Sequence, residues 1–182
     1  MKLWLARHAQ PLIAPGVCYG ATDVAADESA TLLAAQQLAQ VLPLGISMIS
    51  SPLQRCAQLA KSLQAIRPDL SFSTDARLRE MDFGCWEGIP WGDIPQAEFD
   101  TWTADFANYC FGGQESVAEF MRRVVGAWTD VQQGTKHETL WITHAGVHRA
   151  ASLLAKGIFQ IENASQWPRD APPFGGWSLL QA

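Results

Sequence analysis

The sequence predicts an α/β protein with a mostly parallel sheet, and two observations lead to this expectation. Short apolar, partly β-branched runs occur at residues 2–6, 46–50 and 138–143, where they indicate buried strands. Each run is followed by apolar positions that recur at intervals of three and four, which is typical of an amphipathic helix. Strands that alternate with helices favour a parallel sheet, because each helix returns the chain to the same end of the sheet.

Four helices are expected from this spacing. They cover residues 30–41, 52–66, 116–132 and 147–156. Two of them have start signals: Ser51 with Pro52 is read as an N-cap followed by the first helical residue, and Ser116 with Glu119 as a capping box. These signals place the first turns of the second and third helices.

The rest of the chain adds a covering segment and a tail. Residues 83–113 are rich in Gly, Trp and Pro around a polar, helix-like segment near 96–106, and they predict an insertion that covers one end of the sheet as a lid. Residues 174–180 follow a proline-rich stretch and are expected to return as an edge strand. A chain of 182 residues with 48% hydrophobic content fits a single domain over residues 1–182.

The charge balance argues against nucleic acids and membranes as partners. Thirteen Lys and Arg against eighteen Asp and Glu give a formal net charge of -5, and no basic cluster is present. The sequence has no membrane-spanning run and no signal peptide, and its four widely spaced cysteines indicate reduced thiols. A cytoplasmic protein is therefore expected, and the sequence gives no indication of its oligomeric state.

Two of the predicted strands end at a histidine. The first ends at Arg7 and His8, and the third ends at Thr143 and His144 before a Gly-containing turn and a helix. Ligands of open α/β sheets bind beyond the carboxyl ends of the strands, so both histidines are expected in one site. The second strand is followed by Arg55 in the first turn of its helix, where a cation is unfavourable beside the positive end of the helix dipole. That position predicts an anion nearby.

These residues together predict a phosphoryl pocket. Arg7 and Arg55 each present a guanidinium fork that holds phosphate oxygens bidentately. The neutral imidazole of His8 or His144 is a competent nucleophile at physiological pH, and phosphoryl transfer depends mainly on positioning and charge stabilisation. The sequence therefore predicts a small-molecule phosphate monoester as substrate, with no metal and no cofactor required.

An acid is also needed to protonate the leaving alkoxide and later, as a base, to activate water. Glu80 is the best candidate, because a phosphate dianion beside its carboxyl group favours the protonated acid when substrate is bound. Asp82 is the second choice.

Four segments follow one another in a distinctive order. They are Leu5-Ala6-Arg7-His8-Ala9, Ser50-Ser51-Pro52-Leu53-Gln54-Arg55, the stretch from Leu78-Arg79-Glu80 to Glu87-Gly88, and Thr143-His144-Ala145-Gly146-Val147. Together they resemble the histidine phosphatase (phosphoglycerate mutase-like) superfamily over nearly the whole chain. The resemblance implies a three-layer α/β/α sandwich in which His8 is phosphorylated and Glu80 donates the proton. It also implies that Arg7, Arg55 and His144 bind the phosphoryl group.

Three further segments narrow the resemblance. They are Cys18-Tyr19-Gly20-Ala21-Thr22-Asp23, Asp82-Phe83-Gly84-Cys85-Trp86-Glu87-Gly88 and Gly113-Gln114-Glu115-Ser116. They look like alpha-ribazole phosphatases, which remove the 5'-phosphate of alpha-ribazole 5'-phosphate during assembly of the cobalamin nucleotide loop. Further substrate contacts are then expected at Gln10, Tyr19, Gly20 and Ala145. Ala9, Gln10 and Ala145 replace residues usual in the superfamily, which is expected to change secondary phosphate contacts and leave the nucleophile intact.

The other histidines have simpler interpretations. His144 and His148 have the spacing of two metal ligands on one helix, but no third ligand is near them in the sequence, so no metal site is expected. His148 is read as a pocket-wall or solvent-facing residue, and His137 as an exposed loop residue.

Several arginines and tryptophans have two readings. Surface charges are expected at Arg122, Arg123 and Arg149. Packing within the lid is expected for Trp86, Trp91 and Trp102, the alternative being an aromatic wall for a flat leaving group such as a benzimidazole.

The leading function is thus a phosphatase, and three alternatives stay open. One is a broad-specificity sugar or nucleotide phosphatase, and another is a phosphoglycerate mutase, against which the short chain argues. The third is a catalytically weak phosphate-binding regulatory protein, against which the presence of both histidines, both arginines and Glu80 argues.

Overall fold

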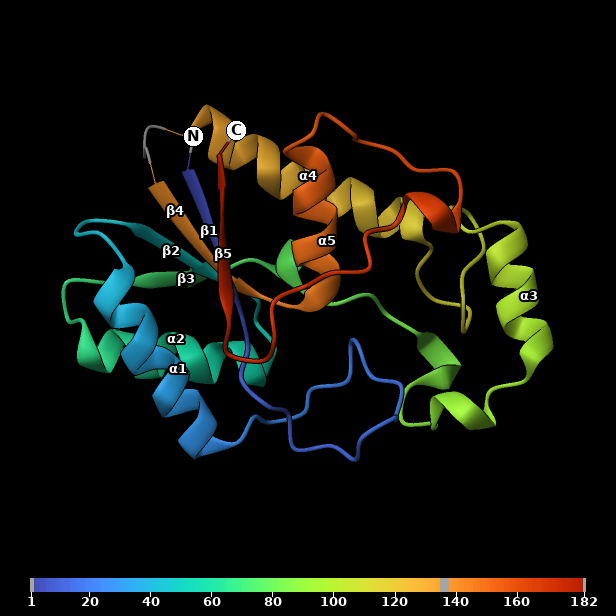
Figure 1. Ribbon diagram of the computed structural model, residues 1–182, viewed down its shortest axis with the longest axis horizontal. Coiled ribbons are helices and arrows are strands. Elements are labelled where there is room, and N and C mark those ends of the chain that lie inside the picture. The colour runs from blue at the N-terminus through green and yellow to red at the C-terminus, as the bar shows by residue number, and fades with distance from the viewer. Residues whose placement is uncertain (1, 135–137, 182) are drawn as a thin grey trace.

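The computed structural model describes residues 2–134 and 138–181 and contains a five-stranded sheet in the order β3-β2-β4-β1-β5 (Figure 1). The strands are β1 (Lys2–Arg7), β2 (Ser47–Ser50), β3 (Phe72–Thr74), β4 (Glu138–Thr143) and β5 (Trp177–Gln181). The first four run parallel, while β5 pairs antiparallel with β1. The predicted sheet and its C-terminal edge strand are therefore confirmed. His137 lies outside the described residues.

Helices cover both faces of this sheet. They are α1 (Glu28–Val41), α2 (Gln54–Ile66), α3 (Gln96–Ala104), α4 (Val117–Gln133) and α5 (Ala145–Leu154). Leu140 and Ile142 of β4 pack with α1 and α2, whereas Trp141 between them packs with α4 and α5 on the other face. This is the three-layer sandwich that the resemblance implies. No helix in the described part of the chain is long and apolar enough to cross a membrane.

The start of α4 is confirmed, and the predicted start of α2 is wrong. The Ser116 hydroxyl accepts the backbone N–H of Glu119, whose carboxylate accepts the N–H of Ser116 at 2.9 Å, which completes a capping box. Ser51 does not cap α2, because this helix begins three residues later, at Gln54. Asp23, from a loop distant in sequence, accepts the Gln54 N–H at 2.7 Å and takes the place of a local cap. Helices α1 and α5 each begin two residues earlier than predicted.

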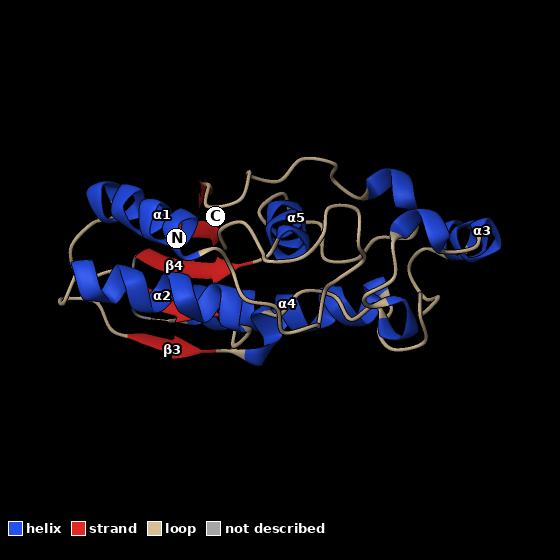
Figure 2. Cartoon of the chain, turned by 90° about the horizontal axis from the view of Figure 1, so that it is seen from below, coloured by secondary structure: helices blue, strands red, loops and turns tan. Residues whose placement is uncertain are grey.

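Residues 83–113 carry most of an aromatic cluster at one end of the molecule, where Figure 2 shows α3 away from the strands. Phe111 is fully buried at its centre. Around it pack the rings of Phe83, Trp86, Trp91, Phe99, Trp102 and Tyr109. The nearest of these is Trp102, stacked on Phe111 with 4.5 Å between ring centroids. The segment therefore has a small apolar core of its own, and α3 confirms the helix expected near 96–106.

Candidate active site

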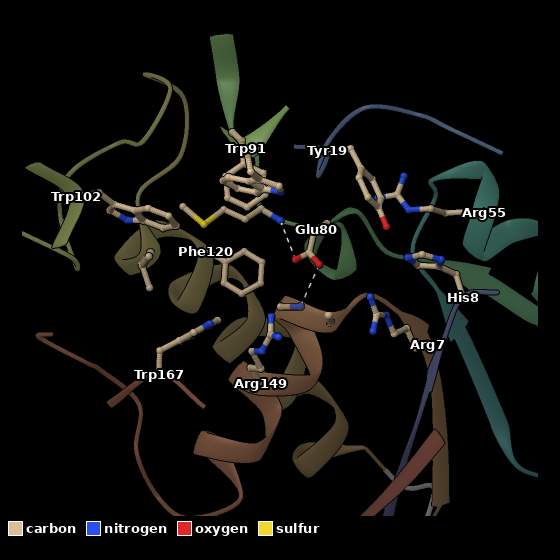
Figure 3. Close-up of a pocket in the computed structure, with 15 residues that line it drawn as sticks. Arg7, His8, Tyr19, Arg55, Glu80, Trp91, Trp102, Phe120, Arg149 and Trp167 are labelled. Atoms are coloured by element: carbon tan, nitrogen blue, oxygen red, sulfur yellow. Dashed lines mark hydrogen bonds between the residues drawn. The ribbon is translucent and has the colours of Figure 1, made fainter. Parts of the chain in front are cut away.

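A cavity of about 380 Å³ lies where β1, β2 and β4 end. Its lining includes Arg7, His8, Tyr19 and Arg55 at one end and Trp91, Trp102, Phe120 and Trp167 at the other, with Glu80 and Arg149 between them (Figure 3). The structure thus brings together most of the residues that the sequence predicted for one site. It also gives that site an aromatic half.

His8 is the first residue after β1, and its backbone N–H donates to the carbonyl oxygen of Thr143 at 3.1 Å. Its Nδ1 lies 2.7 Å from the carbonyl oxygen of Ala9. Because a carbonyl oxygen only accepts, Nδ1 carries the proton and Nε2 keeps its lone pair. Burial lowers the pKa of His8 to about 3, and the positive charge of Arg55 adds to this effect. His8 is therefore neutral at physiological pH, with one tautomer selected by the backbone.

His144 lies behind His8, with 5.1 Å between the two ring centroids. It is completely buried and is not part of the cavity lining. Its Nε2 is 2.9 Å from the hydroxyl oxygen of Ser51, the residue that was expected to cap α2. Burial lowers the pKa of His144 well below its usual value, and the positive charge of Arg55 lowers it further. The neutral His144 ring therefore packs behind His8 and supports it at the carboxyl ends of the strands.

Arg55 is held by the loop that precedes α1. It is fully buried, and its two terminal nitrogens donate to the carbonyl oxygens of Gly20 at 2.6 Å and Thr22 at 2.8 Å. The ring of Tyr19 lies 5.3 Å from the guanidinium carbon. Gly20 does not line the cavity, so its carbonyl group orients Arg55 instead. A side chain at this position would meet the carbonyl oxygen of Met81, 1.9 Å from an added Cβ.

Arg7 ends β1, and one of its terminal nitrogens donates to the carbonyl oxygen of Pro172 at 2.9 Å. The Nε atoms of Arg7 and Arg55 are buried and have no acceptor in the described chain. Buried N–H donors are nearly always paired, so an anion with several oxygens is a fitting partner for both forks. This supports the predicted phosphoryl end of the cavity.

Glu80 projects into the middle of the cavity (Figure 3). Its Oε2 accepts the backbone N–H of Gly146 at 3.0 Å, and its Oε1 accepts the N–H of Met81 at 3.1 Å. Asp82, the second choice, is not part of the lining and accepts the N–H of Gly84 instead. The structure therefore places Glu80 in the cavity lining and Asp82 outside it.

Two arginines that were expected to be surface charges are not. Arg149 lines the cavity and donates to the carbonyl oxygen of Arg169 at 3.1 Å. Arg123 pairs with Glu115 at 2.6 Å and donates to the carbonyl oxygen of Glu80 at 2.9 Å, which fixes the backbone that carries this carboxylate. A signal for Arg149 was present, because it follows the predicted contact Ala145 by one helical turn and shares its helix face.

The tryptophans differ in whether they only pack within the lid or also form an aromatic wall of the cavity. Trp86 is not part of the lining and packs against Phe111, with 6.2 Å between ring centroids, as expected of lid packing. Trp91 and Trp102 pack there too, but both also line the cavity. Sequence reasoning missed Trp167, which comes from the C-terminal part of the chain and completes the aromatic half.

The positions that depart from the superfamily pattern create no backbone strain. Every described residue with a positive φ is a glycine, so Ala9 and Ala145 both have negative φ angles. Ala145 lines the cavity as predicted. Gln10 is exposed and lies outside the lining. His148 is buried rather than solvent-facing, and the described residues contain no cluster of three or more potential metal ligands.

Comparison with known proteins assigns the class. The model of the histidine phosphatase superfamily, branch 1, matches residues 3–175. The chain therefore belongs to this superfamily, as the four sequence segments indicated, and it is a phosphatase of that class. A putative phosphoserine phosphatase 2 from Hydrogenobacter thermophilus is 28% identical over 162 residues, which cover 86% of this chain and 79% of the relative.

Solved structures agree with this assignment. The protein TTHB049 from Thermus thermophilus is 28% identical, with a TM-score of 0.73 over 98% of this chain and 92% of the other. A mycobacterial glucosyl-3-phosphoglycerate phosphatase is 23% identical, with a TM-score of 0.78 over 98% of this chain and 88% of the other. The second likeness concerns the fold alone.

Proposed function

We propose that the protein is a phosphomonoesterase that passes the phosphoryl group through a phosphohistidine at His8. The observation that carries this proposal is the state of the His8 ring. Its Nδ1–H is bound to the Ala9 carbonyl oxygen, which leaves an unprotonated Nε2 on a neutral, buried ring between two arginines. An imidazole in this state is ready to attack phosphorus without prior proton removal.

The reaction then has two steps, and each balances its protons. In the first, Nε2 of His8 attacks phosphorus, the ester P–O bond breaks, and Glu80 gives its proton to the leaving oxygen. In the second, Glu80 takes a proton from water as the water oxygen attacks phosphorus. The P–N bond breaks, its electron pair returns to Nε2, and orthophosphate leaves. Arg7 and Arg55 hold the non-bridging oxygens throughout, where charge is spread in the transition state.

For the substrate we propose alpha-ribazole 5'-phosphate, acting in assembly of the cobalamin nucleotide loop. The support is the order of groups along the cavity. Arg7, Arg55 and His8 form one end of the cavity. Glu80 and Arg149 lie in the middle, and Trp91, Trp102 and Trp167 form the other end (Figure 3). A substrate made of a phosphate, a hydroxylated sugar and a flat ring has its parts in the same order. Indole rings provide stacking faces for such a ring.

A second candidate comes from Arg149. This cation forms no ion pair within the described chain, and its Nε is buried without an acceptor. A leaving group with a carboxylate would complement it, as in phosphoserine, the compound for which the Hydrogenobacter relative is named. Comparing turnover of alpha-ribazole 5'-phosphate and of phosphoserine therefore decides whether the tryptophans or Arg149 select the leaving group.

Two further proposals concern organisation. The chain acts as one domain over residues 1–182, in which the segment 83–113 works as a lid, since that segment supplies Trp91 and Trp102 to the cavity and has its own aromatic core. A cytoplasmic location fits its four free cysteines, two of which are buried.

The test is release of inorganic phosphate in the presence of a chelator, from alpha-ribazole 5'-phosphate, phosphoserine, sugar phosphates, nucleotides and phosphoglycerates. His8→Ala is expected to abolish turnover, and mass measurement of alkali-quenched protein to show a phosphoryl adduct in the wild type only. Glu80→Gln is expected to slow turnover about 100-fold or more. Asp82→Asn is its matched control and is expected to stay within about threefold of the wild type.

Each other outcome has a definite meaning. Full activity in His8→Ala would remove the mechanism. Equal rates on unrelated phosphoesters would keep the phosphatase and discard the cobalamin pathway. Interconversion of phosphoglycerates faster than phosphate release would favour a mutase, and phosphate binding without turnover would favour the regulatory reading.

A further inference from the structure

The turn before β5 is aligned with the end of β1, where the proposed nucleophile lies. The antiparallel register places Ala6 opposite Trp177. The pairing continues past the last strand residues, because the N–H of Arg7 donates to the carbonyl oxygen of Gly176 and the N–H of Gly175 donates to that of His8, both at 2.9 Å. The backbone of this turn is therefore tied to both residues.

Phe174 occupies the corner of this turn. The N–H of Gly176 donates to the carbonyl oxygen of Pro173 at 2.9 Å, which closes a four-residue turn. Gly175 has a φ of +73°, the left-handed conformation that its position in such a turn requires. With the backbone fixed on both sides, the Phe174 side chain has a defined direction.

The Phe174 ring lies against both residues of the proposed phosphoryl end. The guanidinium carbon of Arg7 is 4.0 Å from the ring centroid, a distance typical of a cation–π contact. The His8 ring is 5.5 Å away, centroid to centroid, with 37° between the ring planes. Together with the hydrogen bond from Arg7 to Pro172, this stacking restricts the plane of the guanidinium fork.

We propose that Phe174 is a positioning residue for phosphoryl transfer, and that it holds the Arg7 fork and the His8 ring in their working orientation. The inference rests on the proposed roles of Arg7 and His8. Phe174 does not line the active-site cavity, so its role would act through Arg7 and His8. It lines a separate hollow instead, together with Leu33 of α1 and Ala9.

The competing explanation is simple packing of the C-terminal segment against α1. Phe174 is 36% exposed, so it contributes little to the core, and its loss should barely change stability under either explanation. What separates the two is the affinity for phosphate. A guanidinium released from its aromatic face must be ordered again when it binds an anion, and that cost lowers affinity.

The experiment compares Phe174→Leu, Phe174→Tyr and Phe174→Met with a matched control, Phe159→Leu. Phe159 is also a partly exposed phenylalanine, 47% accessible, and it lines a cavity formed by other residues. For each full-length variant the dissociation constant of inorganic phosphate is measured by calorimetry. Steady-state kcat and KM on para-nitrophenyl phosphate and the thermal midpoint are measured alongside.

We expect Phe174→Leu to weaken phosphate binding about tenfold and to lower kcat/KM at least as much. Phe174→Tyr keeps the aromatic face, so its phosphate affinity and kcat/KM should stay within about twofold of the wild type. The control Phe159→Leu should stay within the same range. Wild-type phosphate affinity in Phe174→Leu, or an equal loss in Phe174→Tyr, would overturn the inference. If Phe174→Leu does not fold, Phe174→Met is expected to show the same loss.

Failure of the proposed function would look different. A wild-type protein without His8-dependent phosphate release would remove the phosphatase mechanism. The phosphate affinities would still decide whether Phe174 orients Arg7. A wild type that is active, with Phe174→Leu equally active, would remove only the role of Phe174.

Discussion

The backbone N–H of Gly146 donates a hydrogen bond to Oε2 of Glu80 at 3.0 Å, and a Cβ added to Gly146 would lie only 2.2 Å from Oε1. Gly146→Ala must therefore displace the proposed acid. A misplacement of about 1 Å at a reacting group can cost about 100-fold, so kcat should fall by that order while phosphate affinity changes little. Ala145→Gly, one residue earlier, is the control and should keep kcat within about threefold. An unchanged kcat in Gly146→Ala would exclude this role for Glu80.

Glu87 holds the loop that orients Arg55. Its carboxylate accepts the backbone N–H groups of Gly20 and Ala21 at 2.9 Å, and the carbonyl of Gly20 in turn holds Arg55. Glu87→Gln replaces one accepting oxygen by a donor, so the loop loses part of its anchor. We expect inorganic phosphate to bind about tenfold more weakly, as measured by calorimetry. Equal affinity would show that the loop keeps its conformation without this carboxylate. Glu98→Gln in α3, at a half-buried carboxylate outside the cavity, is a suitable control.

Stability should depend on pH through the buried histidines. Burial lowers the pKa of His8 and of His148 to about 3. In the unfolded chain both take up a proton near pH 6.5, whereas the native state does so only near pH 3, so acid favours unfolding within this window. Stability is thus highest above about pH 6.5 and falls as the pH is lowered toward about 3.

His148→Phe isolates one of these contributions. Between about pH 3.5 and 6 it should reduce the slope of unfolding free energy against pH by about 1.4 kcal/mol per pH unit, measured by urea unfolding at several pH values. The slope is the readout, because a change in packing shifts stability equally at each pH. Parallel curves for the variant and the wild type would contradict the assignment.

Arg149 should select the leaving group and not the phosphate. It lines the cavity between the polar and aromatic ends (Figure 3). Arg149→Met keeps much of the side-chain length, so we expect KM for the preferred substrate to rise about tenfold and the inhibition constant of inorganic phosphate to stay within about threefold. Arg122→Met, on α4 and away from this cavity, controls for loss of one positive charge. Equal losses for substrate and phosphate would place Arg149 in the phosphoryl end instead.

Phe111 should decide whether residues 83–113 open independently of the sheet. It is fully buried at the centre of the aromatic cluster. Phe111→Ala removes a large buried ring, a change that typically costs about 3–5 kcal/mol. We expect faster hydrogen exchange in 83–113 with the amides of β1 and β4 still protected, which is the behaviour of a separate local unit. Equally faster exchange throughout the protein would contradict the lid.

Much of the phosphoryl end was predictable because it depends on where strands stop. Arg7 ends β1, His8 follows it, and His144 follows β4, so the positions of the strand ends predicted these residues at one edge of the sheet. Arg55 was recognisable from its unfavourable position in the first turn of α2. The capping box at the start of α4 is likewise a local signal, complete within four residues.

The sequence by itself thus determined the class of fold, four of the five described strands, and the residues at the strand ends, whereas the short strand β3 (Phe72–Thr74) was not predicted. The tertiary structure alone decided which residues complete the cavity and support it. Trp167 reaches the aromatic half, and Phe174 meets Arg7 from the other end of the chain. The reason is that strand periodicity and caps act between near neighbours, whereas a cavity wall forms where distant segments meet as the chain buries its apolar surface.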